Sequence, residues 1–157
     1  MRKLALCLML AALTLSATTK KSTTKAPVHV VMAPSAIQWG DAPPTLPKGA
    51  KVAVLEGDPS KKGFFVIRIK APDGYRVPAH WHPTRETLTI ISGTFHLGMG
   101  DTLDTSKGDA MPAGAFGYMD AKMNHYAWME GETVTQVEGM GPFVINYVNP
   151  KDDPSKK

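Results

Sequence analysis

The stretch from Gly74 to Gly93, GYRVPAHWHPTRETLTIISG, constrains the fold of this chain more than any other. It contains His80, His82 and Glu86 in the spacing H-x-H-x-x-x-E. Side chains two residues apart share a face on a β-strand, whereas on an α-helix the two histidines would lie about 200° apart. Prolines on both sides of the histidine pair also disfavour a helix. The spacing therefore predicts a strand that carries potential metal ligands on one face.

The rest of the chain after the N-terminal segment indicates an all-β fold. Short apolar segments rich in β-branched residues recur between glycine and proline turns, and no helical periodicity extends over a typical helix length. Turns are expected at Ser92-Gly93 and at Glu130-Gly131-Glu132. Beside the strand that carries the motif, the expected strands are 28–32, 50–56, 63–70, 94–99, 115–119, 125–129, 133–138 and 143–148. Such a pattern is typical of a sandwich or barrel.

The motif resembles the first signature of the cupin superfamily, G-x5-H-x-H-x3-E-x6-G. The match is without gaps and uses Gly74, His80, His82, Glu86 and Gly93. The resemblance implies that the two histidines and the glutamate bind a metal ion.

The second cupin signature, G-x5-P-x-G-x2-H, matches less completely. Gly114 and His125 are kept, but Asp120 stands in place of the proline and Lys122 in place of the second glycine. By resemblance, His125 is the fourth metal ligand. The departures concern the turn before His125 more than the ligand.

The likeness extends from about Gln38 to Pro150 and points to small single-domain bacterial metal-binding cupins. It implies a jelly-roll β-barrel (double-stranded β-helix), with residues 28–150 as the cupin domain. A homodimer is expected from the resemblance. An exposed first strand at 28–32 would provide an edge for such pairing.

Both ends of the chain lie outside the expected domain. Residues 1–17 have a basic start and a short apolar run, which is typical of a signal peptide; an uncleaved anchor is the alternative. The run is too short for a stable bilayer span, so no stable membrane insertion is expected after cleavage. Residues 18–27 are interpreted as a polar linker and 151–157 as a disordered tail. A periplasmic or secreted location is expected.

Cysteine usage and charge exclude several classes of site. The one cysteine, Cys7, lies in the apolar run, so after cleavage any metal must be bound by histidine and carboxylate. The basic residues concentrate in the tails, and residues 27–150 contain 10 basic and 12 acidic side chains. A domain without a basic surface stripe is not expected to bind nucleic acid.

Three imidazoles and one carboxylate suit a divalent transition metal, which could be Fe, Mn, Ni, Zn or Cu. An octahedral ion held by four protein ligands keeps two open positions for a substrate. A tetrahedral zinc ion with the same ligands would be closed and structural. The ligand set alone does not choose between these cases.

Candidates to bind a substrate are less well defined than the ligands. Arg68 is a candidate because arginine pairs with carboxylates in a bidentate manner; a surface arginine is the alternative. Gln136 and Tyr147 are further candidates, and His96 either lines the pocket or lies at the barrel rim. No catalytic residue is assigned, because no nucleophile with a partnered base is found. The side chains expected to point inward are Leu88, Ile90, Ala127 and Met129.

Three functional hypotheses follow. The chain is an exported metalloenzyme acting on a small oxygenated molecule as a dioxygenase, lyase or isomerase, or a non-catalytic metal-dependent binding or sensor protein, or a storage-type scaffold. Intact ligands argue against the scaffold. The barrel itself does not decide between the first two, because one fold hosts many functions.

Overall fold

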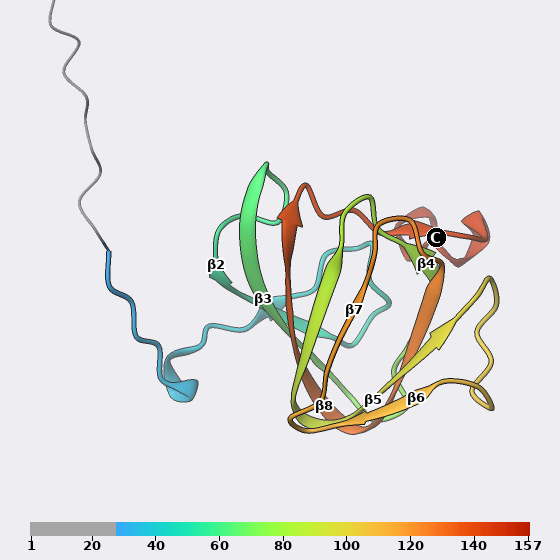
Figure 1. The fold of residues 1–157 in the computed structure, drawn as a ribbon, viewed down its shortest axis with the longest axis horizontal. Helices are drawn as coiled ribbons and strands as arrows, with labels where there is room; N and C mark the ends of the chain where they lie inside the picture. Colours follow the sequence, from blue (N-terminus) through green and yellow to red (C-terminus); the bar gives the residue numbers. More distant parts are fainter. Residues whose placement is uncertain (1–27) are drawn as a thin grey trace, which may run out of the picture. The chain divides into compact units, whose positions relative to one another are not determined.

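The computed structural model describes residues 28–157 (Figure 1). The predicted signal peptide at 1–17 and the polar linker at 18–27 lie outside the described residues. The unit from Met32 to Lys157 is a single all-β domain, and no α-helix occurs in the described part of the chain. Its strands are β1 (Gly40–Asp41), β2 (Lys51–Glu56), β3 (Gly63–Ala71), β4 (Arg76–Trp81), β5 (Glu86–Met99), β6 (Asp109–Pro112), β7 (Phe116–Met119), β8 (His125–Gly141) and β9 (Asn146–Tyr147).

Two long strands, β5 and β8, form the frame of the domain. They pair antiparallel along nearly their whole length, from Glu86 opposite Gly139 to Met99 opposite His125. The first half of β8 also pairs with β4, and its second half pairs with β3. The first half of β5 pairs with β7 and its second half with β6. All pairs are antiparallel, and the sheet curls around the core as the cupin resemblance predicts (Figure 1).

The two predicted turns in this region are wrong, because β5 and β8 bend without ending. Gly93 and Gly131 sit at the bends with φ of 74° and 73°, a conformation that glycine adopts without steric cost. At Gly93 a Cβ atom would lie 2.5 Å from the backbone oxygen of Glu132, so the two strands approach too closely there for a side chain. The register of the β5–β8 ladder shifts at this point and then continues. Glycine here bends the sheet instead of reversing the chain.

The core lies between the two halves of the curled sheet. The predicted inward-pointing side chains Leu88, Ile90, Ala127 and Met129 are all buried, which confirms the strand parity assigned from the metal motif. The buried side chains packed with them include Phe65, Ile67, Val77, Phe95 and Val137. Burial of such apolar area supplies most of the free energy that holds a domain of this size together.

Several predicted elements at the ends of the chain differ in the structure. Residues 28–32 have no regular secondary structure, so the expected edge strand is wrong. The last predicted strand, 143–148, is reduced to the two residues of β9. The tail, predicted to be disordered, forms two 3-10 turns, Pro150–Asp152 and Pro154–Lys156, and a further one lies at Pro34–Ala36. Asn149 and Asp153 cap the turns in the tail by accepting hydrogen bonds from backbone N–H groups.

None of the helical segments among residues 28–157 has the length and apolar character needed to cross a bilayer.

Candidate metal centre

The four predicted ligands come together at the ends of three strands, β4, β5 and β8. His80 lies on β4 and pairs in register with His125, the first residue of β8. His82 follows directly after β4, and Glu86 is the first residue of β5. All four side chains are buried, with at most 8% of their surface exposed. The segment between β4 and β5 therefore returns the glutamate to the same site as the histidines.

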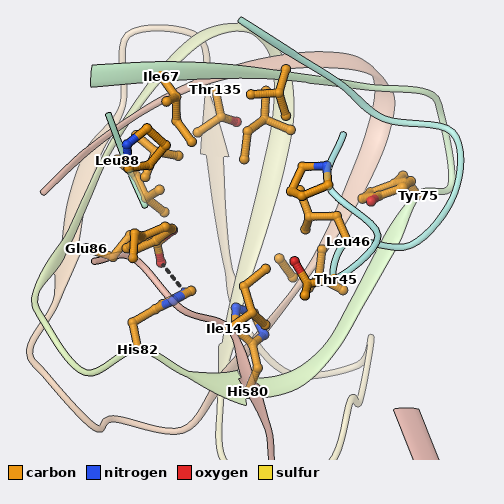
Figure 2. A pocket seen from close by; sticks show the side chains of 18 of the residues that line it. Thr45, Leu46, Ile67, Tyr75, His80, His82, Glu86, Leu88, Thr135 and Ile145 are labelled. Atoms are coloured by element: carbon orange, nitrogen blue, oxygen red, sulfur yellow. Dashed lines mark ion pairs between the residues drawn. The ribbon is translucent and has the colours of Figure 1, made fainter. Parts of the chain in front are cut away.

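The three histidines are close enough to share one ion. Their candidate ligand nitrogens all lie within 4.8 Å of one another. The ring centroids of His80 and His125 are 4.3 Å apart, and those of His80 and His82 are 5.0 Å apart. A buried cluster of three histidines with a carboxylate beside it could hold a metal ion (Figure 2).

Backbone carbonyl groups fix the orientation of all three imidazole rings. The Nδ1 atoms of His80, His82 and His125 lie 2.7, 2.8 and 2.9 Å from the carbonyl oxygens of residues 78, 144 and 123. A carbonyl oxygen only accepts, so each Nδ1 carries the hydrogen and donates it. In a neutral imidazole the lone pair is then on Nε2, which is the usual arrangement of a metal-binding histidine.

The atoms that converge in the centre lack hydrogen-bond donors. The Nε2 atoms of His82 and His125 are buried without a hydrogen-bond partner. Glu86 Oε2 lies 3.5 Å from His82 Nε2, the pair joined by the dashed line in Figure 2. It lies 3.3 Å from His125 Nε2. Buried polar atoms are rarely left unpaired, because their desolvation is costly. A cation satisfies these lone pairs at once, and the set of imidazoles and one carboxylate suits a divalent transition metal.

The protonation states of the centre fit the same interpretation. Burial, together with the neighbouring His125 and His82, lowers the pKa of His80 to about 3. Burial also lowers the pKa of His82, although Glu86 opposes it. At neutral pH both rings are therefore neutral and present a lone pair.

The pKa values of Glu86 and His125 shift in opposite directions. Burial raises the pKa of Glu86, but the nearby His82 and His125 outweigh it and the net pKa is lowered. Burial lowers the pKa of His125, but the Glu86 carboxylate, 3.3 Å from its Nε2, outweighs burial and the net pKa is raised. A cation bound among these nitrogen atoms would compensate the charge of the buried Glu86 carboxylate.

A cavity of about 470 Å³ adjoins the centre (Figure 2). Its lining is mainly apolar, and Asp41, Val54 and Ser60 mark the part that is exposed to solvent. Apart from the four ligands, its walls are formed by residues that include Leu46, Ile67, Tyr75, Leu88, Phe95, Met129, Thr135, Val137, Phe143 and Ile145. The volume suits a small organic molecule.

Comparison with known proteins decides the family. The model of the ChrR cupin-like domain matches residues 27–144. This chain belongs to the ChrR cupin-like family. The cupin resemblance of its two motifs is thereby confirmed, and so is the fold class.

Solved structures show the same fold at low sequence identity. The polyketide cyclase RemF from Streptomyces resistomycificus matches this cupin with a TM-score of 0.67 and 12% identity, over 82% of this chain and 92% of the cyclase. A proposed acetylacetone dioxygenase from Methylibium petroleiphilum PM1 has a TM-score of 0.61 and 18% identity, over 84% and 90% of the two chains. An RmlC-like cupin from Shewanella frigidimarina matches with a TM-score of 0.55 and 14% identity, over 72% and 91%. No functionally curated protein matches this sequence.

This cupin compensates for the departures in its second motif. Lys122 adopts φ of 66°, the left-handed conformation that glycine supplies at this position of the signature. Its backbone N–H donates to the carbonyl oxygen of His82 at 2.8 Å. Asp120, in place of proline, accepts a hydrogen bond from Arg85 in the first motif. The turn before His125 is therefore retained and is tied directly to the other ligand segment.

The predicted substrate residues Arg68, Gln136 and Tyr147 do not line the cavity of this cupin. Arg68 Nε donates to Gln136 Oε1 at 3.1 Å, and Gln136 in turn donates to Glu138. Both lie on the opposite strand faces from the side chains that line the cavity, because faces alternate along a strand. Tyr147 packs near the His80 ring, and its hydroxyl group donates to the backbone oxygen of Thr45 at 2.7 Å.

His96 lies outside the metal centre. Its ring stacks on Trp128 at 4.6 Å, and its Nε2 is 3.1 Å from Glu130. Several polar residues of the cavity lining were not predicted from the sequence, among them Thr45, Tyr75 and Thr135. Thr135 could have been found from its parity, because it shares a strand face with the buried Val137.

Proposed function

We propose that this protein is an exported cupin that binds one divalent transition metal ion through His80, His82, Glu86 and His125. The ion is Fe, Mn, Ni, Zn or Cu. In the adjoining cavity the protein acts on a small oxygenated molecule, by dioxygenase, lyase or isomerase chemistry. The observation that carries the proposal is the convergence of three backbone-oriented imidazoles on a buried carboxylate, with two Nε2 atoms lacking any donor.

The residues of the centre have separable roles. The histidines and Glu86 would hold the ion, and the ion would act as a Lewis acid that polarises a substrate oxygen. The apolar side chains around the centre exclude water and favour the organic part of the substrate. The polyketide cyclase and the proposed acetylacetone dioxygenase among the structural neighbours support a substrate with carbonyl or enol oxygens. A periplasmic or secreted location follows from the expected signal peptide.

One observation favours the alternative, a non-catalytic metal-dependent binding or sensor protein. Beyond the four ligands, the ionisable side chains in the lining described by the structure are Asp41 and Tyr75. Asp41 lies at the exposed part, and the Tyr75 hydroxyl group donates to the carbonyl oxygen of Pro47 at 2.6 Å. No further group is thus poised to move a proton near the centre, and this suits reversible binding.

The metal content of the protein tests the proposal. The chain is expressed with its N-terminal segment, recovered from the periplasm or medium without chelator, and compared with the double variant His80→Ala/His125→Ala. We expect one equivalent of metal in the wild type and none in the variant, while circular dichroism shows that both remain folded. Full metal occupancy in the variant, or none in either protein, contradicts the proposed centre.

Water exchange at the metal separates enzyme from sensor. A centre with open positions keeps exchangeable water, which fast water-proton relaxation of the manganese or copper form detects. Slow relaxation, equal to that of a fully coordinated ion, would favour a closed site without catalysis.

A further inference from the structure

Thr135 is a buried polar residue that the metal centre does not use. It lies on β8, lines the cavity, and is only 2% exposed. Its Oγ1 atom has no hydrogen-bond partner. Thr133, two residues earlier on the same strand, is equally buried, but its hydroxyl group lies 3.2 Å from the Thr94 carbonyl oxygen and 3.1 Å from that of Gly131. The fold therefore satisfies one threonine hydroxyl group and leaves the next one unpaired.

The register of β8 places Thr135 at the far end of the cavity from the carboxylate ligand. Glu86 lies opposite Gly139, and Ile90 lies opposite Thr135. These two rungs are four residues apart, which corresponds to about 13 Å along the strand. Figure 2 shows Thr135 across the cavity from His80. The wall between them carries apolar side chains, among them Ile67, Leu88 and Val137.

The charges of the lining restrict what can fill this space. No lysine or arginine occurs among the cavity-lining residues that the structure describes. A ligand with a charged group away from the metal centre would bury that charge without a partner, which is costly. A sugar would place several hydroxyl groups against Leu88, Phe95 and Val137, where they find no partners.

We infer that the cavity takes an elongated, largely apolar molecule with oxygen atoms at the histidine end and one hydroxyl or carbonyl group at the other end, which hydrogen-bonds to Thr135 Oγ1. The inference rests on the proposed function and names its ligand class. A threonine hydroxyl group both donates and accepts, so either polar group satisfies it. Thr135 is then a specificity-determining residue, since a ligand that lacks the distal group leaves the buried hydroxyl group unpaired.

Binding of matched probes to the metal-containing protein tests this role. Benzoylacetone and its para-hydroxyphenyl analogue differ only in a distal hydroxyl group, and their affinities are measured by titration calorimetry. We expect the wild type to prefer the hydroxylated probe about fivefold. Thr135→Val should abolish the preference, whereas Thr135→Ser should keep it. A preference that is absent in the wild type, or that survives in Thr135→Val, overturns the inference.

Two further probes test the ligand class. The para-carboxyphenyl analogue and gluconate should bind at least about tenfold more weakly than benzoylacetone, because the distal charge and the sugar hydroxyl groups find no partners. Equal or tighter binding of either probe overturns the class.

A stability measurement keeps the inference separate from the metal proposal. In the metal-free protein, Thr135→Val should melt at the same temperature as the wild type or higher, because the lost hydroxyl group had no partner. Thr133→Val is the matched control and should melt lower, because it loses a hydrogen bond. Equal destabilisation by both variants means that Thr135 has a structural partner, and the inference fails.

A protein that passes these melting tests but binds no metal refutes the proposed function, whereas a metal-containing protein without the hydroxyl preference refutes only the inference.

Discussion

His96 and His125 are both paired with a carboxylate, yet only His125 belongs to the metal centre. The Nε2 of His96 lies 3.1 Å from Glu130, and that of His125 lies 3.3 Å from Glu86. The difference is in the surroundings. Glu130 is 76% exposed, whereas Glu86 is buried and faces two histidines. At the exposed pair, water solvates the Glu130 carboxylate and the contact contributes little.

The two histidines also differ in how their rings are held. His125 Nδ1 donates to a backbone carbonyl group, which directs Nε2 toward the cluster. His96 is held by stacking on Trp128 and presents its Nε2 to a single exposed side chain, Glu130. Proximity of a histidine to a carboxylate is therefore a poor sign of a metal site. Convergence of backbone-oriented nitrogens at a buried position is a better one.

The largest expected contrast is in metal affinity. His82→Ala removes a ligand that the cluster cannot replace, and we expect affinity to fall by at least about a hundredfold, beyond the usual cost of losing a supporting partner. His96→Ala should leave it unchanged. Competition with a chromophoric chelator measures both variants. Similar losses in the two would mean that His96 contributes to binding and that the contrast between the two sites is mistaken.

The two carboxylates, Glu86 and Glu130, should also differ in their importance for metal affinity. Glu86→Gln keeps the size of the side chain and removes its charge, so the bound cation loses its only anionic protein ligand. We expect affinity to fall about tenfold to a hundredfold. Glu130→Gln is the matched control on the exposed pair and should change nothing. The same chelator competition reads out both, and an unaffected Glu86→Gln would show that three histidines suffice.

The centre was predictable from sequence because its ligands are local. His80, His82 and Glu86 lie within seven residues of one another in a motif of fixed spacing, and strand parity alone gathers the first two. His125 came only from resemblance, since its pairing with His80 joins segments distant in the chain. The backbone groups that orient the rings belong to turns whose geometry a spacing pattern does not contain.

The substrate-binding residues were harder to predict, because the alternation of side chains along a strand defines two faces without indicating which face is buried. Arg68 alternates with Ile67 and Ile69, and those apolar residues face the cavity. Arg68 therefore lies on the other face and pairs with Gln136. The glycines at 93 and 131 pose a similar difficulty, because a residue that permits positive φ serves a bend as well as a turn. In both cases the neighbouring strand decides: its position determines which face is buried, and whether the glycine bends the strand or ends it.

The smallest expected effect concerns the turn that delivers His125 to the centre. Lys122 holds φ of 66° without the freedom of glycine, and the conformation costs a residue with a Cβ atom about 1–2 kcal/mol. Glycine loses more chain entropy on folding, so Lys122→Gly should raise the free energy of unfolding by only about 0.5–1 kcal/mol. Urea unfolding of the metal-free protein measures the change. Lys122→Ala keeps the strain and serves as the control without a gain. If alanine stabilises as much as glycine, the effect comes from the lysine side chain.

The hydrogen bond from this residue to the His82 carbonyl group uses only backbone atoms, so both variants should bind metal as the wild type does. A change in metal affinity in the glycine variant alone would show that the fixed turn, and not only the ring orientations, distinguishes His125 from His96.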